Sequence, residues 1–308
     1  MTGAPLRAPV LWLTGLSPVR RLVTTGRMGR RVALRFVAGE LLEEGVAAAR
    51  RLGDQGIGAM LDHLGENVSS ERQAAAATDH YVLALKRIEE AGDVDCNIAV
   101  KLTQLGLDLS FDLCVENTER VLAVASERHT QVMIDMESHE YVDRTLDVLR
   151  HLRRRHDGVG LALQSYLYRT AEDVFRLPEG TPVRLVKGAY LEPPEVAYRS
   201  RRDVDRSYAR LFATLLARGH EVHVATHDPR LLEGACRLVD RRAGWDRVEL
   251  QMLYGIRRDL QNGYASQGRP VRTYIPYGDQ WYPYLTRRLA ERPANMWFFA
   301  SNLLRGGA

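Results

Sequence analysis

Eight short apolar runs recur along the 308-residue chain, and their regular repetition leaves few folds open to it. Between them lie segments with the periodicity of amphipathic helices, including four that are long enough to cross between parallel strands: residues 116–129, 140–156, 194–219 and 228–242. The strand candidates are residues 57–64, 96–102, 131–136, 159–166, 182–190, 221–227, 248–254 and 271–277. Strands and helices that alternate in this way predict an α/β fold, a (β/α)8 TIM-type barrel.

The part of the chain ahead of the first strand candidate adds to this barrel. We expect residues 1–55 to form a helical segment that contributes two extra helices, and residues 56–308 to form the barrel as one catalytic domain. A length of 308 residues is ordinary for a single barrel and allows a substantial core. The first strand candidate fits the apolar pattern least well, because residues 57–64 include glycine and polar residues.

Composition limits the class of protein. The chain is 45% hydrophobic and 27% charged, which is typical of a soluble globular protein. The apolar run at residues 10–16 is too short to cross a bilayer, and its arginines follow it, unlike those of a signal peptide. Cys96, Cys114 and Cys236 lack C-x-x-C spacing, so we expect neither a disulfide framework nor a zinc site. These features predict a cytoplasmic protein.

The charge pattern narrows the possible partners. The net charge is +4 and the pI about 9.0, but acidic residues nearly match basic ones along the chain, so no nucleic-acid partner is predicted. The excess concentrates at residues 19–31, which favours a solvated surface or, alternatively, a contact for anionic lipid headgroups. Only three of the 43 basic residues are lysines, Lys86, Lys101 and Lys187, and the last two end apolar runs.

Polar or aromatic residues follow every strand candidate. In a TIM-type barrel the chemistry lies at the carboxyl ends of the strands, so these residues form the predicted rim of the site. They are Glu66, Lys101, Asp135, Gln164, Arg184 with Lys187, Thr226 with His227, Gln251, and Tyr274. One such residue would more often belong to an ordinary loop, but a complete series around one rim indicates a functional site.

A helical segment near the C-terminus, residues 284–295, carries two adjacent arginines. Tyr284, Arg287, Arg288 and Glu291 are spaced i, i+3, i+4 and i+7, so they share one face of the helix. A solvated surface is the ordinary explanation for such a pair. The aromatic residues around it favour an anion clamp instead, because the guanidinium fork grips a carboxylate or phosphate with two hydrogen bonds. Lys101 is the third candidate cation of this clamp.

The motifs exclude several kinds of site and leave alternatives open. The chain contains no H-E-x-x-H, no G-x-x-x-x-G-K-[ST] and no G-x-G-x-x-G, and no metal site is predicted. The clamp suggests a carboxylate-bearing substrate, and other rim residues suggest a larger, phosphate-bearing cofactor. Two alternatives are a Schiff-base aldolase, with Lys187 or Lys101 as nucleophile, and a non-enzymatic protein that binds surfaces through its N-terminal arginines.

A series of segments resembles one known family. VKLTQLGL, IDMES, VRLVKGAYLEP, VATHD, QMLYG and YIPYG…YPYLTRRLAERPAN are similar to proline dehydrogenase in its short, single-function bacterial form, over about residues 36–302. The resemblance implies non-covalent FAD and oxidation of L-proline to Δ1-pyrroline-5-carboxylate by hydride transfer from proline C5 to flavin N5. It also implies a membrane quinone as electron acceptor, a separate pyrroline-5-carboxylate (aldehyde) dehydrogenase downstream, and peripheral contact with the inner membrane surface.

The resemblance also implies roles for individual residues. The substrate positions are Lys101, Asp135, Arg184, Leu185, Tyr190, Tyr274, Tyr284, Arg287 and Arg288. The cofactor positions are Gln164, Arg184, Lys187, Gly188, Ala189, Thr226, His227, Gln251 and Glu291. Glu66 matches an acidic residue that pairs with Arg287 as a gate. Leu191 departs from the family, which often has an aromatic residue there, and Tyr284 implies a preference for proline over 4-hydroxyproline.

Overall fold

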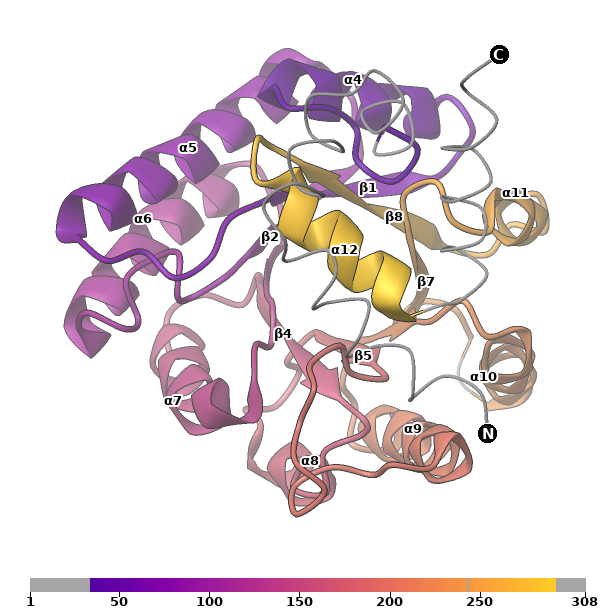
Figure 1. Cartoon of the computed structure of the whole chain (residues 1–308). Helices are drawn as coiled ribbons and strands as arrows, with labels where there is room; N and C mark the ends of the chain where they lie inside the picture. The colour runs from indigo at the N-terminus through magenta and orange to yellow at the C-terminus, as the bar shows by residue number, and fades with distance from the viewer. Residues whose placement is uncertain (1–33, 243, 292–308) are drawn as a thin grey trace, which may run out of the picture.

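The computed structural model describes residues 34–242 and 244–291, apart from the side chains of residues 242 and 287–291. Eight parallel strands form one closed barrel, in the order of the sequence (Figure 1). They are β1 (Gly58–His63), β2 (Cys96–Val100), β3 (Val132–Ile134), β4 (Val159–Gln164), β5 (Val183–Val186), β6 (Val222–Ala225), β7 (Val248–Leu253) and β8 (Val271–Tyr277). The predicted (β/α)8 barrel is confirmed, including its weakest strand candidate.

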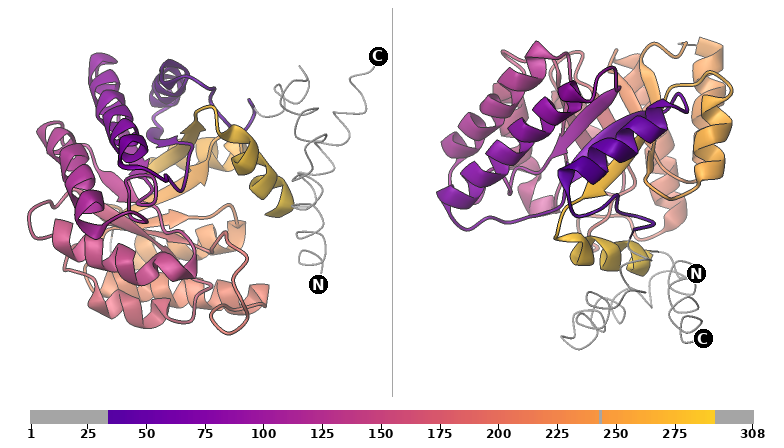
Figure 2. Two further views of the ribbon diagram at one scale, coloured as in Figure 1. Left: turned by 60° about the vertical axis from the view of Figure 1, so that its left-hand side comes forward. Right: turned by 90° about the horizontal axis from the view of Figure 1, so that it is seen from above.

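Helices lie around the outside of the barrel and, in the case of the last one, across its end (Figures 1 and 2). They are α4 (Leu42–Gly53), α5 (Glu71–Glu90), α6 (Phe111–Glu127), α7 (Val142–Leu152), α8 (Thr170–Asp173), α9 (Arg201–Ala217), α10 (Pro229–Arg242), α11 (Arg258–Ala265) and α12 (Trp281–Glu291), with the 3-10 turns η1 (His139–Tyr141) and η2 (Val174–Arg176). Ser70 and Ser110 cap α5 and α6, because their hydroxyl groups accept backbone N–H groups of the first turn. None of the described helices is both long and apolar enough to span a bilayer.

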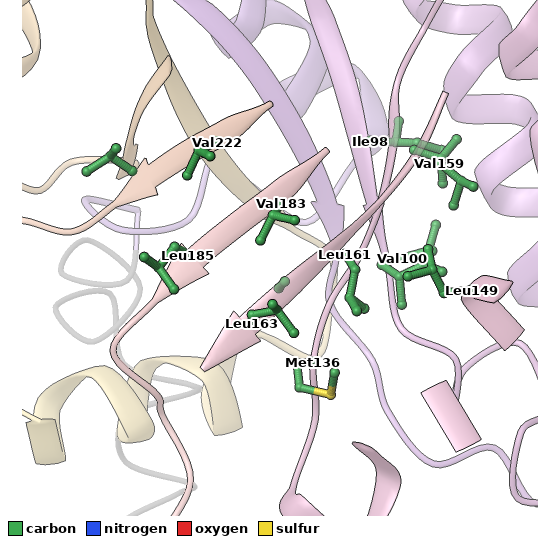
Figure 3. Close-up of a cluster of buried hydrophobic side chains, with 14 of the residues drawn as sticks. Ile98, Val100, Met136, Leu149, Val159, Leu161, Leu163, Val183, Leu185 and Val222 are labelled. Carbon is green, nitrogen blue, oxygen red and sulfur yellow. The ribbon is translucent and has the colours of Figure 1, made fainter. Parts of the chain in front are cut away.

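The main hydrophobic core lies between the strands and the outer helices. Alternate residues of a strand point to the same face, so Leu161 and Leu163 of β4 and Val183 and Leu185 of β5 all point outward. Figure 3 shows these side chains together with Leu149 of α7. All five are 2% exposed or less, and this burial fixes the register of the strands, because a slip by one residue would turn apolar side chains to the wrong face.

Leu185 lies on the opposite face of β5 from its neighbour Arg184. The guanidinium of Arg184 points into the barrel and reaches the sulfur of Met60 in β1, 3.0 Å away. Leu185 points to the layer of helices, where it is fully buried, and its carbonyl accepts the hydroxyl of Tyr208 in α9 at 2.9 Å. This orientation gives no support to the predicted role of Leu185 as a wall of the substrate pocket, because neighbouring residues of a regular strand face opposite sides, and that role stays a prediction.

A second apolar cluster joins α12 to the rest of the chain. Figures 1 and 2 show α12 at the end of the barrel where the strands have their carboxyl ends. The cluster consists of Phe36, Val37, Leu64, Trp281, Tyr282, Tyr284 and Leu285. The start of α12 is thereby fixed to the segment before α4 and to the loop after β1. Within residues 34–55, the described part of the predicted N-terminal segment, α4 is the one helix.

Candidate active site

Three ionised side chains from neighbouring strands meet inside the barrel. Asp62 lies in β1, while Lys101 directly follows β2 and Asp135 directly follows β3. The ammonium nitrogen of Lys101 lies 2.7 Å from Asp62 Oδ1 and 3.6 Å from Asp135 Oδ2. Asp62 is 1% and Lys101 7% exposed, so both charges are removed from water and depend on each other.

The surroundings of Lys101 keep its side chain charged. Burial on its own lowers the pKa of Lys101, because a low-dielectric interior disfavours an ammonium. The adjacent carboxylate of Asp62, together with Tyr81 and Glu66, opposes this, and their combined effect is larger than that of burial, so the pKa of Lys101 lies above its ordinary value. Lys101 is therefore a fixed point charge near neutral pH.

Arg184 and Tyr274 complete a network around Asp135. The Arg184 guanidinium forms an ion pair with Asp135, and its carbon lies 5.0 Å from the centre of the Tyr274 ring. The Tyr274 hydroxyl donates to Asp135 Oδ2 at 2.7 Å. Burial lowers the pKa of Arg184, and burial, reinforced by Asp62, raises that of Tyr274. Two cations and two carboxylates balance here, so the network is preorganised without a net charge of its own.

Gln164 and Lys187 bring further polar groups to the same rim. Gln164 ends β4, and its side-chain nitrogen donates to the backbone carbonyl of Glu137 at 2.8 Å. Lys187 directly follows β5, and its ammonium lies 2.5 Å from Asp205 and 2.9 Å from Asp228. Burial alone would raise the pKa of Asp228, but hydrogen bonds from Arg201 and Lys187 lower it to about 2.

Further predicted cofactor positions follow β5 and β6. Thr226 is buried, and its hydroxyl accepts the N–H of Asp228 at 3.2 Å. His227 Nε2 accepts the N–H of Leu253 at 2.9 Å, which ties the imidazole to β7. Gly188 has φ of +123°, and a Cβ there would lie 2.4 Å from the Tyr166 ring, so the backbone turn after β5 requires glycine.

Gln251 does not join these groups. It lies within β7 rather than at its end, and its side-chain nitrogen contacts Glu249 and His223, each at 2.9 Å. His223 in turn contacts Glu221, which precedes β6, and Glu249 pairs with Arg272 near the start of β8. These partners lie toward the amino ends of the strands, so the structure gives no support to the predicted cofactor contact of Gln251.

Comparison with known proteins identifies the family. A family model described as proline dehydrogenase matches residues 46–301. The chain belongs to the proline dehydrogenase family. It is 41% identical to proline dehydrogenase from Deinococcus radiodurans, over 89% of this chain and 91% of that protein. It is 38% identical to proline dehydrogenase 1 from Bacillus subtilis subsp. natto, over 91% and 92% of the two chains. The predicted resemblance to the short form of the family is confirmed.

A solved structure agrees with this assignment. Proline utilization A (PutA) from Bdellovibrio bacteriovorus, inactivated by N-propargylglycine, matches with a TM-score of 0.79 at 25% identity, over 92% of this chain and 36% of that chain. The proline dehydrogenase family thus accounts for the barrel and for nearly the whole length of this chain. Among the described residues, no group of three His, Cys, Asp or Glu side chains is placed to hold a metal ion.

Several of the predicted site residues lie on or near α12. Tyr284 is 7% exposed and belongs to the cluster that fixes the start of the helix. The side chains of Arg287, Arg288 and Glu291 lie outside the described residues, so the predicted clamp is not observed. Glu66 lies three residues beyond the end of β1 and is half-buried, and its negative charge contributes to the raised pKa of Lys101.

Two buried residues of the rim region were absent from the sequence-based prediction. Asp62 is the direct partner of Lys101, and its signal was an aspartate inside an otherwise apolar strand candidate. Glu137 is buried, and its carboxylate accepts both the N–H and the hydroxyl of Thr103, at 3.1 and 2.7 Å. Burial raises the pKa of Glu137. Its position two residues after Asp135 on the same rim was the available clue.

Proposed function

We propose that the protein oxidises L-proline to Δ1-pyrroline-5-carboxylate with non-covalently bound FAD. Membership of the proline dehydrogenase family supports the reaction. The observation that carries the proposal is the buried network of Asp62, Lys101, Asp135, Arg184 and Tyr274. It presents a charged ammonium, a guanidinium and an aromatic ring together at the rim below α12. Those are the groups that a small, ring-shaped amino acid and a redox cofactor require.

The substrate end of the site would be formed by Lys101 together with α12. In this proposal, Arg287 and Arg288 hold the proline carboxylate, and Lys101 contributes a third positive charge. Tyr274 and Tyr284 would pack against the proline ring, with Tyr190 as a further wall. Tyr284 would also crowd a hydroxyl group on the ring, which favours proline over 4-hydroxyproline. Glu66 would pair with Arg287 when the site is empty and act as a gate.

The hydrogen-bond donors at the predicted cofactor positions fit a flavin dinucleotide. Arg184 and Gln164 are hydrogen-bond donors on adjacent strands, suited to the ring nitrogen N5 and its neighbouring carbonyl. The glycine turn at Gly188 allows close approach of the backbone, with Ala189 beside it. Lys187, Thr226 and His227 would lie toward the diphosphate, and Glu291 completes the set of predicted positions. Lys187 would share its ammonium with Asp205 and Asp228 in such a contact.

The residues of the chain would orient the substrate and exclude water. A bound FAD would supply the two-electron chemistry, in which the hydride from proline C5 is accepted at N5. The carboxylate contacts would fix the ring so that C5 faces the cofactor, which removes most of the orientational entropy from the reaction step. Asp62 and Asp135 keep Lys101 and Arg184 charged and in place, so the network needs no rearrangement when substrate arrives.

The same proposal includes an electron acceptor, a membrane contact and a second enzyme. Electrons would pass to a membrane quinone, and the protein would touch the inner membrane surface peripherally through the basic part of residues 1–55. A separate aldehyde dehydrogenase would oxidise the product. The division into a helical segment, residues 1–55, and a catalytic barrel, residues 56–308, is part of this proposal.

The Schiff-base aldolase is the less favoured alternative. A lysine nucleophile needs a neutral amine, and therefore a lowered pKa. The pKa of Lys101 is instead raised beside Asp62, and Lys187 lies between two carboxylates. The raised pKa keeps Lys101 in its ammonium form, which cannot attack a carbonyl group, and the nitrogen of Lys187 is held by both of its carboxylate partners.

The visible absorption spectrum of the purified protein tests the proposed function. With FAD bound, we expect a band near ~450 nm that bleaches when L-proline is added without oxygen. Lys101→Met should weaken or abolish bleaching at a fixed proline concentration, whereas Lys86→Met, at an exposed lysine of α5, should leave it unchanged. A protein that takes up no FAD would refute the proposal. A protein that takes up FAD but is indifferent to proline would refute the substrate and retain the cofactor.

A further inference from the structure

In the loop after β5, an apolar residue is exposed and the charged residue next to it is buried. Leu191 is 57% exposed, whereas the side chain of Glu192 beside it is 3% exposed. Glutamate is rarely buried unless its oxygens are fully engaged, because desolvating a carboxylate is costly. Burying Glu192 therefore costs free energy, and specific hydrogen-bond partners must offset that cost.

Those partners come from two other loops of the rim. Glu192 Oε1 accepts the backbone N–H of His139 at 2.9 Å and the hydroxyl of Tyr166 at 3.1 Å. Its Oε2 contacts Nδ1 of His139. His139 lies in the connection after β3, four residues beyond Asp135, and Tyr166 lies two residues beyond Gln164. One carboxylate thus joins the connections that follow three consecutive strands.

Tyr166 extends the same attachment along the loop. Its backbone N–H donates to the carbonyl of Lys187 at 2.9 Å, and its carbonyl accepts the N–H of Tyr198 at 2.8 Å. Its ring fills the space beside Gly188, where a Cβ would lie 2.4 Å from a ring carbon. Burial raises the pKa of the Tyr166 hydroxyl, and the charge of Glu192 raises it further, so the hydroxyl stays protonated and donates.

We propose that Glu192 is a positioning residue, which fixes residues 187–190 against the barrel through His139 and Tyr166. This inference rests on the proposed function, because that function places Ala189 beside the cofactor and Tyr190 at the substrate. Glu192 touches neither one in this role. From its buried position, Glu192 determines the position of residues 187–190, which form one wall of the site.

Three variants test the inference. Glu192→Ala removes the acceptor oxygens, and Glu192→Gln keeps one acceptor for His139 and Tyr166. Glu195→Ala is the matched control, because it removes an exposed carboxylate from the same loop. Hydrogen exchange of the backbone amides around His139 and across residues 187–198 is measured on the purified protein, without substrate. The KM and kcat for proline are then measured with FAD bound.

We expect Glu192→Ala to accelerate exchange in these two segments by about 10-fold or more, because hydrogen bonds to a charged group limit local opening by that order. The KM for proline should rise about 10-fold, and kcat should fall less, since the wall is displaced but the reacting groups remain. Glu192→Gln should lie closer to the unsubstituted protein, and Glu195→Ala should match it in both measurements.

Two results would overturn the inference. One is that Glu192→Ala matches Glu195→Ala in exchange and in KM. The other is that Glu192→Ala loosens the whole barrel while Tyr166→Phe, which removes only the hydroxyl donor, leaves exchange and KM unchanged. The exchange measurement needs no activity, so it decides the role of Glu192 even if the protein does not oxidise proline. Failure of flavin bleaching alone would count against the proposed function and not against this attachment.

Discussion

The ion pair between Asp62 and Lys101 makes the strongest quantitative prediction. Replacing Asp62 with asparagine removes the negative charge 2.7 Å from a lysine that is 7% exposed. Breaking a buried pair in this way typically costs about 3–5 kcal/mol of folding free energy. Asp135 lies 3.6 Å from the same ammonium, and Coulomb attraction falls with the inverse of distance, so it retains about three quarters of the attraction of Asp62. We therefore expect a loss near the lower limit, about 3 kcal/mol.

Thermal unfolding followed by circular dichroism measures this loss. For a chain of this size, about 3 kcal/mol corresponds to a decrease in Tm of about 5 °C. The control is Asp79→Asn, which breaks an ion pair of the same 2.7 Å length, between Asp79 and Arg120, whose side chains are 67% and 46% exposed. Exposed pairs contribute about 0–1 kcal/mol, so the control should unfold within about 2 °C of the unsubstituted protein.

The pH dependence gives the same prediction a second test. The pKa of Lys101 is raised in the folded state, so the stability from its charged form is fully present below the unfolded pKa of about 10.4 and is lost as the pH rises through the folded value. The difference between Asp62→Asn and the unsubstituted protein should therefore not increase from about pH 7 to pH 9. Equal effects of Asp62→Asn and Asp79→Asn on Tm would refute the reasoning, since burial would then make no difference.

Three further substitutions test residues in this network or near it. Tyr274→Phe removes the hydroxyl that donates to Asp135 at 2.7 Å. Steady-state kinetics should show kcat/KM for proline lowered about 10-fold or more, and Tm should change by less than about 4 °C. Unchanged kinetics would contradict the role of the hydroxyl. Burial raises the pKa of Glu137, so its carboxylate costs stability as the pH rises above about 4.3. The Tm of Glu137→Gln should therefore increase relative to that of the unsubstituted protein from about pH 4 to pH 7. Tm curves of the two proteins that run parallel over this pH range would count against this. Burial, with a smaller contribution from His80, lowers the pKa of His63 to about 4, so stability that is present above about pH 6.5 is lost as the pH falls towards 4. In urea unfolding, the stability of His63→Gln should therefore be less sensitive to acid than that of the unsubstituted protein. Equal acid sensitivity of the two proteins would refute this prediction.

The periodicity of the chain was enough to predict the fold. Apolar strands that must be buried on both faces, separated by helical segments, have few arrangements other than a closed parallel barrel. Lys101, Asp135, Gln164 and Lys187 were placed correctly at the rim, because each ends or directly follows its strand. Polar residues in those positions need no knowledge of distant contacts to be identified.

Two site predictions find no support in the structure, because the sequence gives neither the face on which a side chain lies nor its level along the barrel. Leu185 was assigned to the pocket with Arg184, although neighbours in a strand face opposite ways. Gln251 was assigned to the rim, but it lies inside β7 and contacts groups nearer the amino ends. The strand limits decide both cases, and a shift of one residue exchanges the interior and exterior faces.

The sequence by itself therefore determined the order of the elements, the barrel and the family, since these depend on local periodicity and on motifs read along the chain. Only the tertiary structure decided which charges meet. Asp62 pairs with Lys101 across 39 positions, and Glu192 with His139 across 53. Contacts of this kind depend on how the strands are staggered when the barrel closes, and on which loops then lie side by side. Closure is a property of all eight strands together, so no single segment carries that information.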